Sequence, residues 1–239
     1  MIRSHADRQA RELVIAAARS ERRAAFGNDV AAMVPIEVTS YCASTCKFCG
    51  WRSDNKDMVR LAISEQAIRD QAKVLAQMGF SHFEIAGGDH LPFLKKDLKA
   101  LVTALKDETR SANPDARVSM CLVPMHQAQY EQLRDCGLDC VLTWQETYRE
   151  DLFHHHIPSG PKAWGIDLDY NMTRGGDGFL QRLQSQEMAI RAGLQAGLGA
   201  MIGLDECTEA DVLSVIVHGK KLIEHYGGNS TALLGRARQ

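Results

Sequence analysis

The chain has 239 residues, 45% of them hydrophobic and 24% charged, a size and composition that suit a folded domain with a sizeable core. The formal net charge of -2 provides no broad basic field for nucleic acid and no polybasic membrane address. Residues 1–23 carry charges throughout, so they lack the apolar run of a signal peptide or membrane span. We therefore expect a cytoplasmic protein with reduced thiols and no nucleic-acid or membrane partner.

The pattern of apolar residues predicts helices that alternate with strands. Helices are expected at residues 6–26, 64–78, 91–110, 126–136, 179–196 and 209–225, and strands at 36–39, 82–86, 117–123, 138–144, 199–204 and 231–234. A long segment, 145–177, has no element assigned. Strands that alternate with helices of ten or more residues predict βαβ units and a parallel sheet.

Right-handed crossovers fold such a series into a barrel or a partial barrel. We therefore expect an α/β fold, a parallel (β/α)6-type partial TIM barrel over residues 34–239, preceded by an N-terminal helical segment over residues 1–33. Ligand sites in these folds gather at the carboxyl ends of the strands. Each predicted strand end is therefore a place to look for chemistry.

Three cysteines, Cys42, Cys46 and Cys49, follow the first predicted strand at Cys-x3-Cys-x2-Cys spacing. A four-iron cluster normally takes four cysteine ligands, so three would leave one iron open. A zinc site needs a fourth nitrogen or sulfur ligand, and the chain has no second Cys-x2-Cys to supply it. A disulfide with a spare thiol is the other alternative. A chain without export signals favours metal or redox chemistry, and hence the cluster.

This motif, with Phe48 directly before the last cysteine, resembles the cluster motif of radical S-adenosylmethionine (SAM) enzymes. In that family SAM chelates the open iron through its amine and carboxylate, and an electron from the cluster cleaves SAM to a 5′-deoxyadenosyl radical. The resemblance implies a [4Fe-4S] cluster and SAM as cofactors, with the partial barrel typical of the family. It also implies a flavodoxin or ferredoxin-type reductant as partner.

The second predicted strand is followed by Gly87, Gly88 and Asp89. These residues resemble the Gly-Gly-Glu motif with which radical SAM enzymes hold the amino group of SAM, although aspartate reaches less far than glutamate. Two glycines would allow the backbone to approach a ligand closely. An ordinary turn is the alternative.

The resemblance assigns three more residues to SAM. Glu146, after the fourth strand, would accept hydrogen bonds from the ribose hydroxyls, as acidic residues do in dinucleotide sites. Arg182, in an Arg-Leu-x-Ser sequence similar to the family's Arg-Leu-x-Thr, would pair with the SAM carboxylate through its planar fork. Leu204, at the end of the fifth predicted strand, would lie beside the adenine. A solvated or capping glutamate, a surface arginine and a plain core leucine are the alternatives.

The tetrapeptides Gln-Glu-Thr-Tyr at 145–148 and Ser-Gly-Pro-Lys at 159–162 resemble one branch of the superfamily. That branch contains the tyrosine lyases of thiamine and hydrogenase-cofactor synthesis and the tryptophan lyase of thiopeptide biosynthesis, to which residues 49–55 point most. The likeness implies a lyase of amino acid metabolism: the radical abstracts hydrogen from an aromatic amino acid, and a carbon–carbon bond breaks. A mutase or methyltransferase on another amino acid, and a non-catalytic cluster-binding scaffold, remain alternatives. No catalytic residue is assigned.

The remaining cysteines and histidines are weaker candidates. The cysteines at 121, 136, 140 and 207 are expected in the core, where free cysteine is common. The histidines at 154–156 are expected in a loop beside the site, and His90 could face the substrate or solvent. The resemblance covers residues 35–228 and then falters, so we expect a C-terminally short relative, or one whose barrel is completed by an oligomer or a partner chain.

Overall fold

The computed structural model describes residues 7–28, 30 and 32–227. The chain divides into two compact units, residues 1–32 and 33–239. The first unit contains α1 (Arg8–Phe26), which begins where the Asp7 side chain accepts hydrogen bonds from the backbone N–H groups of Gln9 and Ala10. It ends at Gly27, whose φ of 59° suits glycine.

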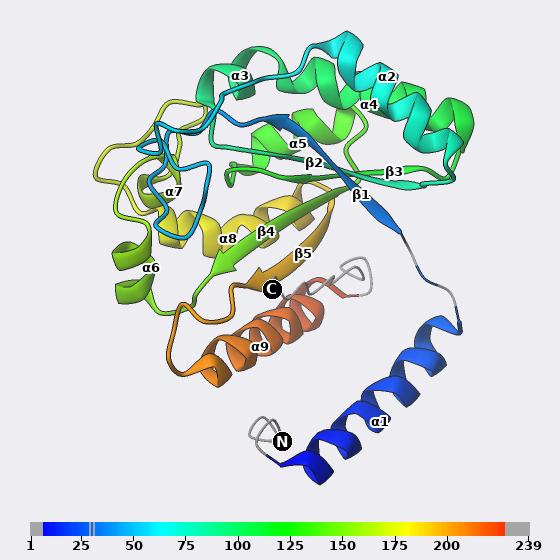
Figure 1. Ribbon diagram of the computed structural model, residues 1–239, viewed down its shortest axis with the longest axis vertical. Coiled ribbons are helices and arrows are strands. Elements are labelled where there is room, and N and C mark those ends of the chain that lie inside the picture. Colours follow the sequence, from blue (N-terminus) through cyan, green and yellow to red (C-terminus); the bar gives the residue numbers. More distant parts are fainter. Residues whose placement is uncertain (1–6, 29, 31, 228–239) are drawn as a thin grey trace. The chain divides into compact units, whose positions relative to one another are not determined.

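The second unit is built on a five-stranded parallel sheet whose strands lie in chain order (Figure 1). The strands are β1 (Met33–Thr39), β2 (His82–Gly87), β3 (Arg117–Cys121), β4 (Cys140–Glu146) and β5 (Gln195–Ala200). Each strand pairs in parallel with the next, so a crossover connects every neighbouring pair. The predicted α/β class with a parallel partial barrel is confirmed.

Helices lie in the crossovers and after β5, and they cover one face of the sheet. They are α2 (Glu65–Gln77), α3 (Leu91–Lys96), α4 (Leu98–Ala112), α5 (Gln127–Asp135), α8 (Gly178–Arg191) and α9 (Thr208–Tyr226), with the short α6 (Glu150–His156) and α7 (Pro161–Trp164) between β4 and α8. α2 contacts β1, α4 contacts β3, and α8 contacts both β4 and β5. In the described part of the chain no helix is long and apolar enough to cross a membrane.

The alternation of side chains along the strands separates two apolar clusters. On the helix-covered face, residues such as Phe83, Ile85 and Met120 belong to the main core. On the opposite, inner face, Leu142 and Trp144 form a second cluster. Gly199 of β5 lies against the Trp144 ring. Only glycine fits at this position, because a Cβ on residue 199 would lie 1.9 Å from the ring.

Several predicted boundaries are wrong. The helix expected at 91–110 is two helices, because Asp97, with φ -110°, interrupts the helical path between α3 and α4. The helix expected at 179–196 ends at Arg191, since Gly193, with φ 83°, turns the chain back. The fifth strand therefore occupies Gln195–Ala200 rather than 199–204.

The fourth strand runs to Glu146, two residues further than expected, and the segment expected to lack elements contains α6 and α7. The histidines at 154–156 therefore lie on a helix rather than in a loop. The predicted sixth strand, 231–234, lies outside the described residues.

Candidate active site

The loop of residues 40–55, which we call the cluster loop, follows β1 and carries the three motif cysteines. Cys46 is buried, and Cys42 and Cys49 are half-buried. The backbone N–H groups of Ser44 and Asp89 both donate to the Cys42 sulfur at 3.4 Å. Such donors stabilise a sulfur that carries negative charge.

Burial is the largest influence on the pKa of the Cys42 and Cys46 thiols. It raises the pKa of Cys42 to about 12, with a further rise from Asp89, and that of Cys46 to about 11. Both groups are therefore protonated thiols at neutral pH unless a metal displaces the proton.

The described His, Cys, Asp and Glu side chains form no group of three around a point where one metal ion could be held. A mononuclear zinc site needs such convergence. An iron–sulfur cluster places each thiolate on its own iron, so three cysteines on one loop fit the cluster without converging on a single ion.

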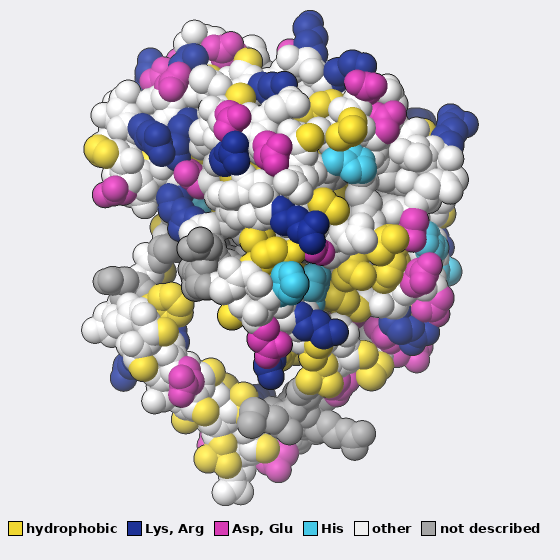
Figure 2. All heavy atoms as spheres, turned by 180° about the vertical axis from the view of Figure 1, so that it is seen from behind, with side chains coloured by type: hydrophobic (Ala, Val, Ile, Leu, Met, Phe, Trp, Pro, Cys, Tyr) yellow, Lys and Arg dark blue, Asp and Glu magenta, His cyan; other side chains and the backbone are white. Residues whose placement is uncertain are grey.

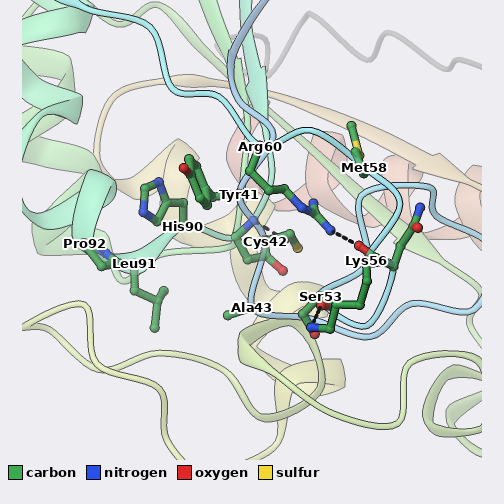
Figure 3. A pocket seen from close by; sticks show the side chains of 12 residues that line it. Tyr41, Cys42, Ala43, Ser53, Lys56, Met58, Arg60, His90, Leu91 and Pro92 are labelled. Carbon is green, nitrogen blue, oxygen red and sulfur yellow. Dashed lines mark hydrogen bonds between the residues drawn. The ribbon is translucent and has the colours of Figure 1, made fainter.

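Arg60 fixes the path of the cluster loop. Its guanidinium donates hydrogen bonds to the backbone carbonyls of Ser40, Trp51, Arg52 and Asn55 at 2.5 to 3.1 Å. Figure 3 shows the Arg60 side chain extending across the loop. One planar group thus ties the start of the loop to its end, on both sides of the cysteines.

The turn after β2 packs directly against the cluster loop. A Cβ on Gly88 would lie 2.3 Å from the Tyr41 carbonyl oxygen, and the Ala43 N–H donates to the Asp89 carbonyl at 3.1 Å. The Gly88 backbone therefore approaches the cluster loop closely. The buried Asp89 carboxylate accepts a hydrogen bond of 2.6 Å from Ser44 Oγ.

Segment 156–162 packs against the other side of the same loop. The Lys47 N–H donates to the His156 carbonyl at 2.9 Å, and the Lys162 N–H donates to Ser44 Oγ at 2.9 Å. Gly160 touches the loop so closely that a Cβ would lie 2.4 Å from the Ala43 carbonyl oxygen. Ser44, which is fully buried, thus joins three segments far apart in sequence.

Glu146, Lys162 and Arg182 gather at the end of β4. Glu146 is a buried residue with φ 70°, next to an irregularity in the pairing of β4 with β5. Lys162 Nζ forms an ion pair with Glu146 Oε1. Burial is the largest single influence on Lys162 and opposes the charged ammonium, as does Arg182. The attractions of Glu146, Cys46 and Asp89 together outweigh them, and the pKa of Lys162 lies above its usual value.

Arg182 reaches this group from α8. Its Nη1 donates to the Trp144 carbonyl at 2.7 Å, while its buried Nε has no hydrogen-bond partner within the described residues. A buried guanidinium with an unused donor is suited to an anionic ligand such as a carboxylate. The residues therefore fit the predicted contact with the SAM carboxylate.

Leu204 lies in a turn four residues beyond the end of β5, not at the strand end as expected. It is half-buried, and its carbonyl lies 3.1 Å from His156 Nε2. Because the His156 carbonyl also binds the cluster loop, α6 links Leu204 to that loop.

A pocket of about 450 Å³ lies beside the cluster loop (Figure 3). Its lining includes Cys42, Asp89 and His90, together with Lys56 and Met58. Glu146, Arg182 and Leu204 are not among its lining residues. The structure thus places the predicted site residues in two groups, on either side of the loop segment that contains Ser44.

The sequence reasoning missed three residues that organise the site: Ser44, Arg60 and Lys162. Lys162 belongs to the recognised Ser-Gly-Pro-Lys sequence, and that was the signal available for it. Ser44 and Arg60 act through contacts with residues outside their own short stretch of sequence, so no local sequence pattern predicts their roles.

The other cysteines and histidines lie mostly apart from this site. Cys140 is buried as expected, but Cys207 is exposed, which corrects the core prediction for that residue. His90 stacks on Phe93 and lies 3.2 Å from Thr39 Oγ1.

On the face shown in Figure 2, basic and acidic side chains are mixed, with no broad field of one sign.

A parallel α/β partial barrel with a three-cysteine loop after its first strand defines a class of cluster-dependent enzymes. The chain belongs to the radical SAM superfamily, whose family model matches residues 36–216. Enzymes of this superfamily use a [4Fe-4S] cluster and SAM, and these are the cofactors of this chain.

Comparisons with individual proteins give narrower likenesses. The chain is 30% identical over 214 residues to 2-iminoacetate synthase of Escherichia coli (strain K12), covering 88% of this chain and 51% of the relative. It is 24% identical to 3-methylornithine synthase of Methanosarcina barkeri, covering 85% and 52%. The crystal structure of HydG, a maturase of the [FeFe]-hydrogenase, superposes with a TM-score of 0.80 at 20% identity, covering 97% and 48%, and shows the shared fold. The chain spans about half the length of these relatives.

Proposed function

We propose that this chain takes part in the SAM-dependent radical cleavage of a carbon–carbon bond in an aromatic amino acid, tryptophan or tyrosine. The observation that carries the proposal is the convergence on one loop of the cysteine motif, the Asp89 turn and the segment that brings Lys162 to Glu146. This arrangement joins predicted contacts for the cluster and for the SAM amine and ribose into one hydrogen-bonded unit.

The substrate class is supported by the likeness to 2-iminoacetate synthase. 2-Iminoacetate is the two-carbon skeleton that remains when an α-amino acid loses its side chain at the Cα–Cβ bond. The product named for this relative is therefore what carbon–carbon cleavage of an amino acid would leave. The aromatic side chain follows from the Gln-Glu-Thr-Tyr and Ser-Gly-Pro-Lys sequences.

The proposed roles of the residues follow the order of the strands. The cluster would be bound by Cys42, Cys46 and Cys49, and SAM by Gly87, Gly88 and Asp89 at its amine, Arg182 at its carboxylate, Glu146 at its ribose and Leu204 at its adenine. When bound, these cofactors supply a carbon radical that abstracts hydrogen from the substrate. The protein would hold the reactants in place. Because Asp89, Glu146 and Arg182 are buried, it would also exclude water from the reactants.

The electron for the cluster would come from a flavodoxin or ferredoxin-type reductant. We place the protein in the cytoplasm, where its thiols stay reduced.

The test is anaerobic reconstitution with iron and sulfide, followed by dithionite, SAM and a panel of amino acids. We expect 5′-deoxyadenosine, together with a side-chain fragment from tryptophan or tyrosine. A protein that binds a cluster and never cleaves SAM would be a scaffold, and the proposal would fail.

A second candidate is a mutase on another amino acid, favoured by the likeness to 3-methylornithine synthase. It would cleave SAM equally well but return a rearranged product of unchanged mass. Mass spectrometry of the products separates the two candidates.

A further inference from the structure

Lys162 makes three contacts that connect the two sides of the site. Its Nζ pairs with Glu146 Oε1, its backbone N–H donates to Ser44 Oγ at 2.9 Å, and its Nζ lies 5.5 Å from the centre of the Phe48 ring. Phe48 stands between the second and third motif cysteines. The Lys162 side chain is only 14% exposed, so the ammonium is held in place rather than solvated.

The charges around Lys162 are balanced. Glu146 and Asp89 carry negative charge, and Arg182 carries positive charge; all three act on Lys162. Lys162 makes the count two positive and two negative. Without it, a buried site would hold an excess carboxylate, and burying an unpaired carboxylate is costly.

We propose that Lys162 is a positioning residue that holds the Glu146 carboxylate in one orientation for the ribose of SAM. The inference rests on the proposed function and deepens it. Lys162 occupies Oε1, which leaves Oε2 to accept from the ribose hydroxyls. The φ of 70° at Glu146 and its backbone hydrogen bond from the Met201 N–H, at 2.7 Å, fix the base of the same side chain.

Removal of the lysine charge has a defined consequence. A buried carboxylate without its partner takes up a proton or turns toward solvent. In either case the ribose loses a charged acceptor, and hydrogen bonds to charged groups contribute about tenfold to hundredfold in affinity. Each variant keeps the backbone N–H of residue 162 that donates to Ser44 Oγ, and the cysteines and Leu204 keep their own side chains, so we expect the loss of affinity at the ribose.

The experiment measures equilibrium binding of SAM, and of a SAM analogue that lacks both ribose hydroxyls, to the reconstituted protein. The variants are Lys162→Met, Lys162→Gln and Lys162→Arg, with Lys73→Met as matched control. Lys73 is an exposed lysine of α2 that pairs with the Glu108 carboxylate at 3.7 Å and does not line the pocket beside the cluster loop. Cluster absorbance and the unfolding midpoint are recorded for each variant.

We expect the wild-type protein to prefer SAM over the analogue by about tenfold to hundredfold. Lys162→Met and Lys162→Gln should bind SAM only as well as the analogue, with analogue affinity unchanged, and Lys162→Arg should recover part of the preference. Lys73→Met should behave as wild type. Glu146→Gln should give the same loss, and combining it with Lys162→Met should add little.

The inference is overturned if Lys162→Met keeps the preference for SAM, or if it loses affinity for SAM and for the analogue equally. It is also overturned if Lys162→Gln and Lys162→Met both fail to take up a cluster, since Lys162 would then be needed for assembly rather than for the ribose. A wild-type protein that binds a cluster but neither ligand would instead refute the proposed function.

Discussion

Replacement of Gly160 by alanine tests the contact that joins segment 156–162 to the cluster loop. Gly160 has φ 100° and ψ -177°, a region open almost only to glycine, and strain there costs about 1–3 kcal/mol. A Cβ would also lie 2.4 Å from both the Ala43 carbonyl oxygen and Ser44 Cα. Both are backbone atoms of the cluster loop, so no side-chain rotation relieves the clash.

Overpacking of this kind costs about 1–3 kcal/mol more. We therefore expect Gly160→Ala to lower the free energy of unfolding by about 2–6 kcal/mol in total. Gly175 is the matched control. It has φ 77° and nothing within 4 Å of a Cβ position, so Gly175→Ala carries only the backbone strain, about 1–2 kcal/mol.

The assay is urea unfolding of both variants without the cluster, followed by iron content after anaerobic reconstitution. We expect Gly160→Ala to lose clearly more stability than Gly175→Ala and to take up little iron, because the cluster loop must move to make room. If the two variants lose equal stability and bind equal iron, the packing of Gly160 on the cluster loop is wrong.

Three further predictions concern the cluster and the pH dependence of stability. Cys46→Ala should abolish the brown absorbance of the cluster and all SAM cleavage, whereas Cys140→Ala should keep both at a cost of about 1 kcal/mol for a small cavity; equal behaviour of the two would contradict the ligand assignment. Arg60→Met should lose its cluster to a chelator several-fold faster than wild type, while Arg69→Met, on the surface of α2, should not; equal rates would show that the four carbonyl contacts do not hold the loop. Burial lowers the pKa of His218 below its usual 6.5, so the unfolded chain takes up the proton first, and stability present above pH 6.5 falls as the pH drops below that value. His218→Gln should flatten that fall in urea unfolding at a series of pH values, and an unchanged slope would refute the reasoning.

Local patterns in the sequence were sufficient for the fold class and for the position of the cluster loop. Cys-x3-Cys-x2-Cys is a contiguous signal, and the period of apolar residues distinguishes strands from helices without knowledge of their neighbours. Glu146 and Arg182 could be proposed as site residues for the same reason, since Glu146 stands in a short recognisable sequence at the end of β4 and Arg182 in another on α8.

Where elements end was decided by single residues whose effect depends on the folded backbone. Gly193 ends α8 because it adopts a left-handed conformation, and this moves β5 four residues earlier and leaves Leu204 in a turn. The spacing of apolar residues in the sequence, taken alone, would extend this helix beyond Arg191.

Only the tertiary structure decided what the site residues touch. Ser44 joins Asp89 and Lys162, which are 45 and 118 residues away in the chain, and Lys162 reaches Glu146 through the turn that Gly160 makes against the cluster loop. Such contacts depend on how buried surfaces fit and on where buried charges find partners, and these are properties of the packed chain. The sequence therefore predicted which residues would carry the chemistry, while the fold determined that a lysine stands between the cluster loop and the carboxylate at the end of β4.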